Sequence, residues 1–148
     1  MSEWYSDELG DDWMVCRGAA MRILQEESSL KEIVQLVGMD ALGAQDRLTM
    51  ETAKSIREDY LHQNAFHEID TYSSLKKQLL MLRLILEFDA RGREQLEKNV
   101  DIEDIIELPV REKIGRAKYI PEDRIAAFDE IFKEIKSEMV ALSNEGEI

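Results

Sequence analysis

The sequence predicts an all-α protein, a bundle of about six helices joined by short connections. Apolar residues recur three and four positions apart along most of the chain, which is the spacing of a helix with one buried face. Only two prolines and seven glycines occur in 148 residues, and no stretch of convincing length alternates apolar and polar residues as a strand does. We therefore expect helices that pack on one another around one core.

A first helix is expected after residues 1–10, which show no clear period and suit a tail or linker. Asp11 and Asp12 are the candidate caps of this helix, because a carboxylate stabilises its amide end. The apolar stripe of the helix contains Trp13, Cys16, Ala20 and Ile23. Cys16 is best interpreted as a core thiol, since no side chain that would activate it is evident.

Residues 29–32 read Ser-Leu-Lys-Glu, the pattern of a capping box, and so predict the start of a second helix. The inward positions of this helix are Leu30, Ile33, Val34 and Val37. Gly38 is expected to end it, because the left-handed conformation after a helix is least costly for glycine.

The third expected helix runs from Asp46, its N-cap, to about Gln63. Its inward stripe contains Ala53, Ile56 and Tyr60. An acidic turn over residues 40–46 precedes the helix, and a loop over residues 64–66 ends it. A rigid rod of this kind can couple an event at one end to the other.

The fourth expected helix is capped by Ser73 or Ser74 and reaches about Lys98. It is rich in leucine, isoleucine and methionine on several sides, which predicts a central position in the bundle. Asp101 is expected to cap a short fifth helix, and Pro109 to break the chain after it.

Residues 110–118 predict another short helical piece, followed by a last helix with Pro121 at its first position. The apolar residues of the last helix are Ile125, Phe128, Phe132, Ile135, Met139 and Leu142. Their spacing suits a coiled-coil seam, but too few heptads occur to prefer that over packing within the domain. We expect one helical domain over residues 11–143 and a frayed tail over residues 144–148.

Composition excludes several classes of protein. The formal net charge of −13 argues against nucleic acid and anionic lipid as direct partners, since phosphates would be repelled. One cysteine cannot form an internal disulfide, which fits a cytoplasmic protein. No apolar run approaches the roughly 20 residues of a membrane span, and the N-terminus does not have the pattern of a signal peptide. We therefore expect no direct membrane contact.

No catalytic residue and no metal site is predicted. The sequence has no G-x-x-x-x-G-K-[ST] phosphate loop, and no serine is linked to a histidine as in a nucleophilic triad. Asp59 and His62 lie three residues apart, a possible pair of ligands, but no second motif of that kind occurs. Surface histidines are the favoured interpretation of His62 and His67.

Several short motifs occur in one order and spacing that together resemble a known family. These are IVQLVG and MDALGAQD at residues 33–46, IREDYLHQNAF at residues 56–66 and PVREKIGRAKYIPE at residues 109–122. They are similar to the C-terminal domain of the catalytic subunits of rotary ATPases. The greatest similarity is to the catalytic subunit of archaeal A-type and vacuolar V-type ATPases, and it extends from Trp4 to about Leu142.

The resemblance implies a nucleotide contact at the end of the third helix. In the family, the matching loop lies at the adenine edge of the bound nucleotide. The residues at these positions are Gln63, Asn64, Ala65 and Phe66. An aromatic side chain can stack on a purine, and amide side chains can donate to or accept from it. From the residues alone, a helix end with Asn64 after its last turn and Phe66 in the core is the favoured interpretation.

The resemblance also implies a contact with a rotor. The matching turn of the F-type subunit is an acidic DELSEED loop that touches the central stalk. The corresponding residues here are Asp40, Ala41, Leu42, Gly43, Ala44, Gln45 and Asp46. Ala41, Gly43, Ala44 and Gln45 stand where the F-type loop has acidic or polar residues, which favours shape and stiffness over a purely electrostatic drive. Without the resemblance, a solvated connection between helices explains the turn.

The resemblance places the chemistry outside this chain. The phosphate loop and the magnesium ligands for ATP and ADP belong to the preceding nucleotide-binding domain, so this chain alone should not hydrolyse ATP. The implied partners are that domain, neighbouring B subunits and the central stalk. The complex would be peripheral to the cell membrane and coupled to proton or sodium transport. A stand-alone acidic adaptor that binds partner helices is the alternative.

Overall fold

The computed structural model describes residues 2–61 and 75–146, and the fold below refers to these residues. They form six α-helices with short 3-10 and π-helical turns between them, and they contain no strand. The predicted all-α class is therefore confirmed.

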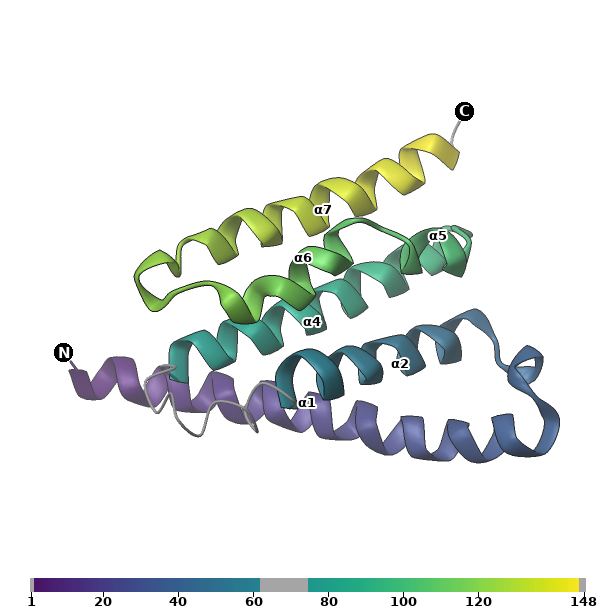
Figure 1. The fold of residues 1–148 in the computed structure, drawn as a ribbon, viewed down its shortest axis with the longest axis horizontal. Helices are drawn as coiled ribbons and strands as arrows, with labels where there is room; N and C mark the ends of the chain where they lie inside the picture. The colour runs from purple at the N-terminus through teal and green to yellow at the C-terminus, as the bar shows by residue number, and fades with distance from the viewer. Residues whose placement is uncertain (1, 62–74, 147–148) are drawn as a thin grey trace.

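The first two helices form an antiparallel hairpin (Figure 1). Helix α1 (Ser2–Val37) is followed by the 3-10 turn η1 (Met39–Ala41) and by α2 (Ala44–Ser55). The π-helical turn η2 (Ile56–Leu61) continues α2. Gly38 ends α1 as predicted, with a φ of 92° that glycine adopts readily, but its ψ of 166° is extended rather than that of the left-handed helical region.

Helix α4 (Leu75–Glu97) is the central element and packs against α1, α2 and α7. Short helices α5 (Ile102–Ile106) and α6 (Val110–Arg116), with η3 (Ala117–Tyr119) and η4 (Glu122–Arg124), lead to α7 (Ala127–Gly146). Figure 1 shows α7 on one side of α4 and the α1–α2 hairpin on the other.

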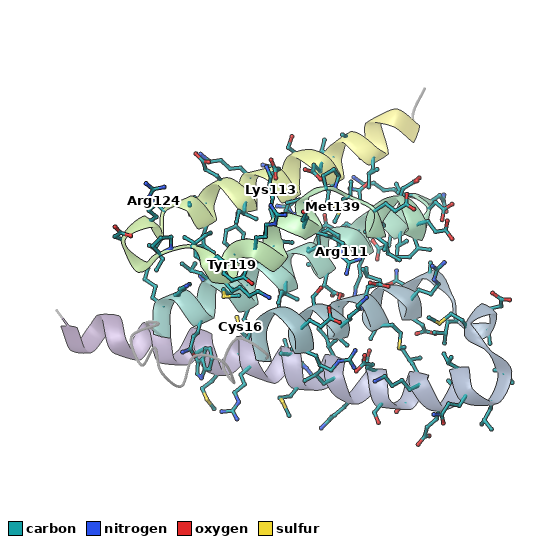
Figure 2. All side chains as sticks on the ribbon, viewed as in Figure 1. Cys16, Arg111, Lys113, Tyr119, Arg124 and Met139 are labelled. Atoms are coloured by element: carbon teal, nitrogen blue, oxygen red, sulfur yellow. The ribbon has the colours of Figure 1, made fainter. Side chains whose placement is uncertain are left out.

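The core surrounds α4, as its apolar sequence predicted. The α4 side chains buried there are Met81, Leu82, Leu84, Ile85 and Phe88, and they meet Leu48, Ile56, Ile105, Phe128, Ile135 and Met139 from other elements. Cys16 packs against this cluster from α1, as expected of a core thiol (Figure 2). The apolar stripe of α7 packs within the domain, on α4 and α6: Phe128, Ile135 and Met139 are buried, and Phe132 and Leu142 are partly buried.

Helix α1 is continuous, so the predicted start of a second helix at Ser29 and the caps Asp11 and Asp12 are wrong. A favourable N-cap stabilises a helix start by only about 1 kcal/mol, and an established helix extends readily through such residues. Near Ser29, the buried carboxylate of Glu27 is also bonded to Arg57 of η2, which holds this part of α1 in place.

Helix α2 begins two residues before the predicted N-cap Asp46. Gly43 is the N-cap, with extended backbone and no capping side chain, and Asp46 lies in the first turn. Burial of Leu42 fixes where the chain enters α2, and Ala44 is a strong helix former. The carboxylate of Asp46 still lies at the amide end of the helix, where its charge is favourable.

Pro121 is not the first residue of α7. Its ψ of 154° is extended, and it instead precedes the 3-10 turn η4, where the Arg124 amide donates to the Pro121 carbonyl over 2.9 Å. Proline fixes φ only, so it permits an extended residue as readily as a helix start. The predicted cap Asp101 is confirmed: its side chain accepts from the Glu103 amide at the start of α5.

Candidate functional site

The turn predicted to contact a partner lies at the far end of the α1–α2 hairpin, at one extreme of the long axis of the molecule (Figure 1). Six of its seven residues, Asp40, Ala41, Gly43, Ala44, Gln45 and Asp46, are exposed. Leu42 is the exception, because its side chain is buried with 8% exposure. Leu42 therefore anchors the turn, and the other six form its surface.

Apolar side chains extend this surface along the end of α1. Leu36 is 83% exposed, Val37 67% and Met39 51%, and Ile33 is also exposed. We call Leu36, Val37 and Met39 the apolar tip. Large apolar side chains that gather on an exposed surface are a feature of interaction sites.

The exposure of Ile33 and Val37 overturns their predicted inward placement, whereas Leu30 is buried as expected. Five of the eight residues from Leu30 to Val37 are apolar, at more positions around the helix than one contact face can cover. Helix α1 meets η1 and α2 on one side at this end, so the other apolar side chains face outward. The excess of apolar residues from Leu30 to Val37 was the sequence pattern that could have predicted the apolar tip.

The predicted nucleotide-contacting residues, Gln63, Asn64, Ala65 and Phe66, lie outside the described residues, as does His62. The described chain leads to them through η2, a π-helical turn, and such turns are frequent at functional sites. Arg57 of η2 donates from Nη1 to Glu27 Oε1 of α1 over 2.6 Å. The last described turn before residue 62 is therefore fixed to α1.

Polar contacts elsewhere join neighbouring helices. Arg111 of α6 points toward α2, where its Nη2 lies 3.0 Å from Glu51 Oε2 (Figure 2). The cavity beside this pair measures about 10 Å³, which is room for about one water molecule and for no substrate.

Hydrogen bonds with carboxylates raise the pKa of Arg91, beside Glu87, and the pKa of Lys113, beside Glu134.

Residues 2–61 and 75–146 contain no group of three histidine, cysteine or acidic side chains placed to hold a metal ion. Within the same ranges, no helix is both long enough and apolar enough to span a membrane. The candidate site that the described residues present is the surface at the hairpin end, where the exposed turn and the apolar tip lie.

The comparisons with known proteins agree on one family. Residues 2–106 match the family described as the C-terminal domain of V and A type ATP synthase. The V-type ATP synthase alpha chain of Acetivibrio thermocellus is 59% identical over 143 residues, 96% of this chain and 24% of that protein. The alpha chain of Clostridium perfringens is 55% identical over 146 residues, 99% of this chain and 25% of that protein.

The chain therefore spans about a quarter of the length of the curated relatives it matches. A further alpha chain, from Thermoanaerobacter pseudethanolicus, is 53% identical over 146 residues. These relatives are bacterial, whereas the motifs had pointed to archaeal and vacuolar enzymes.

Proposed function

Because this chain belongs to the family of C-terminal domains of V and A type ATP synthases, we propose that it couples nucleotide binding to rotation in the complete enzyme. In this proposal the full alpha chain binds ATP or ADP with magnesium in a preceding domain, and this domain transmits force to a central stalk. Rotation of the stalk is coupled to transport of protons or sodium ions. The family match disfavours a stand-alone adaptor.

The observation that carries the proposal is the apolar tip at the exposed end of a helix hairpin. The hairpin packs along the central helix, so a force on its end is transmitted to the body of the domain. Near the other end of the hairpin, η2 leads to residues 63–66, for which we propose the adenine contact. One stiff element thereby connects the two proposed sites.

The same proposal identifies the partners of the domain and the location of the assembly. The partners are the preceding domain of its own chain, neighbouring B subunits and the central stalk. The partner surface on the stalk is apolar in part, since Leu36 and Val37 are largely exposed and only Asp40 and Asp46 in the turn are charged. The assembly lies on the cytoplasmic side and is peripheral to the membrane.

A double substitution at the apolar tip tests this function in the assembled enzyme. Leu36→Ser with Val37→Ser removes exposed apolar contact and buries nothing new, so folding is expected to persist. We expect fewer ions transported per ATP hydrolysed. The matched control is Met14→Ser with Val15→Ser, two residues of the same helix that are 65% and 70% exposed. Unchanged coupling in the tip variant would contradict the proposed rotor contact.

A further inference from the structure

A single arginine fastens the turn to the central helix. The Arg93 guanidinium of α4 donates from Nη1 to Gln45 Oε1 over 2.8 Å and from Nη2 to Thr49 Oγ1 over 2.7 Å. Gln45 is both a residue of the turn and part of the first turn of α2. Thr49 lies one helical turn further along and is buried. Arg93 thus forms hydrogen bonds with two successive turns at the start of α2.

The guanidinium is itself held by a second side chain of α4. Asp89 Oδ2 accepts from Arg93 Nε over 2.9 Å, and Asp89 Oδ1 accepts from Nη2 over 3.1 Å. Asp89 Oδ1 also accepts from Thr52 Oγ1 of α2 over 2.7 Å. Two parallel bonds to a carboxylate fix the plane of the arginine, which a lysine ammonium cannot reproduce.

Apolar contacts close the same interface. At Gly92, beside Arg93, an added Cβ would lie 3.1 Å from Leu48 Cδ2 and 3.3 Å from Ile105 Cγ2. The lack of a side chain lets α2 and α5 approach α4 closely. Helices in such close contact resist both separation and sliding, because interiors pack densely. The polar network therefore lies beside the closely packed apolar contact of α4 with α2 and α5.

This network differs from an ordinary surface ion pair. Exposed pairs contribute little to stability, since water and salt screen them. Here the Asp89 side chain is only 13% exposed, and the partners Thr49 and Thr52 are buried, whereas Arg93 is 31% exposed and its bond to Gln45 lies at the surface. The bonds also run across a helix interface, from α4 to α2, and so resist a displacement of the hairpin end.

We propose that Arg93 is a positioning residue that stiffens the hairpin end, so that a force on the apolar tip moves the whole domain. The inference rests on the proposed contact of the tip with a rotor. Arg93 does not touch the rotor or the nucleotide in this account. It acts through Gln45 and Thr49, by transferring the force to α4 before the hairpin bends.

The test compares Arg93→Lys with Arg91→Lys in the assembled enzyme. Both changes keep the charge and lie on α4, but the hydrogen bond of Arg91 to Glu87, 2.8 Å long, stays within that helix. For Arg93→Lys we expect amide hydrogen exchange over residues 44–49 to accelerate about tenfold, because local opening becomes easier. The ratio of ions transported to ATP hydrolysed is expected to fall, with the melting temperature close to that of Arg91→Lys.

Two results would overturn the proposal. The first is a lower melting temperature for Arg93→Lys with an unchanged transport ratio, which gives the network a structural role only. The second is a transport ratio that falls equally in Arg91→Lys. The tip variant separates the two proposals: if it lowers the ratio and Arg93→Lys does not, the stiffening role fails and the rotor contact stands. If neither lowers the ratio, the rotor contact fails as well.

Discussion

Glu27 of α1 and Arg57 of η2 form a partly buried ion pair, with 2.6 Å between Oε1 and Nη1. The Glu27 side chain is 6% exposed, and Lys31, one turn along α1, lies 3.8 Å from the same oxygen. The carboxylate thereby joins the middle of α1 to the turn that leads out of the described hairpin. Removing its principal partner leaves a buried charge poorly compensated.

Arg57→Ala is therefore expected to lower the free energy of unfolding by about 2–3 kcal/mol. This is less than the loss of roughly 3–5 kcal/mol for a fully buried pair, because the Arg57 side chain is 37% exposed and Lys31 remains nearby. Urea unfolding of the wild-type and Arg57→Ala proteins measures this loss of unfolding free energy. The control is Arg116→Ala, whose pair with Glu112 is 73% and 70% exposed and should contribute at most about 0.5 kcal/mol. Equal losses in the two variants would rule out the anchoring role.

Gly92→Ala and Gly18→Ala should change stability in opposite directions. Both glycines lie inside helices, where alanine is favoured by roughly 0.5–1 kcal/mol. Gly18 has open space around an added Cβ, so its substitution should stabilise by about that amount. At Gly92 the new methyl meets Leu48 and Ile105, both fully buried, and overpacking typically costs about 1–3 kcal/mol.

We expect a net loss of about 1 kcal/mol for Gly92→Ala, after the gain in helix propensity is subtracted. Thermal unfolding of the two variants side by side gives the sign directly. Stabilisation by Gly92→Ala would show that α2 and α5 can move away from α4 without cost, contrary to the close contact described above.

Asp101→Ala should destabilise the domain by about 1 kcal/mol, because it removes the side chain that accepts from the Glu103 amide. Asp101→Asn keeps an acceptor and should cost little. Asp104→Ala is the control, since Asp104 is an exposed residue of the same short helix and is not its cap. Guanidinium chloride midpoints compare the three, and a loss in Asp104→Ala as large as in Asp101→Ala would exclude capping as the cause.

Phe66→Ala in the assembled enzyme should weaken nucleotide binding by roughly 1–3 kcal/mol, the range for one base stacked on an aromatic side chain. Phe66→Tyr keeps the ring face and should bind normally. If Phe66 instead fills the core, truncation should cost roughly 3–5 kcal/mol of stability. Measuring nucleotide affinity and melting temperature for both variants distinguishes these, and a destabilised Phe66→Ala enzyme with normal affinity would exclude the adenine contact.

Local patterns predicted most of the fold. The apolar period of α4, the cap Asp101 and the break at Pro109 each depend on residues a few positions apart, and each is confirmed. The errors occurred where tertiary contacts outweigh local preference. Ser29 has the pattern of a helix start, but α1 continues through it beside the anchored Glu27.

The candidate site was predictable only in part. The turn over residues 40–46 was located from its motif, and the exposed tip could have been deduced from the excess of apolar residues before it. The link from Arg93 to Gln45 joins residues 48 positions apart, so no local pattern reveals it. The adenine contact at residues 63–66 is still a prediction.

Helix α4 packs both against the α1–α2 hairpin and against α7, and this determines which residues an independently folding domain must include. The family match ends at residue 106, yet Phe128, Ile135 and Met139 of α7 have no exposed surface and belong to the same cluster as α4. A chain cut at residue 106 would leave the α7 side of α4 in water, at a cost of about 25 cal/mol for each Å² of apolar surface. The residues that match the family model are therefore fewer than the residues needed for a stable fold. Any excised or transplanted domain should extend through α7.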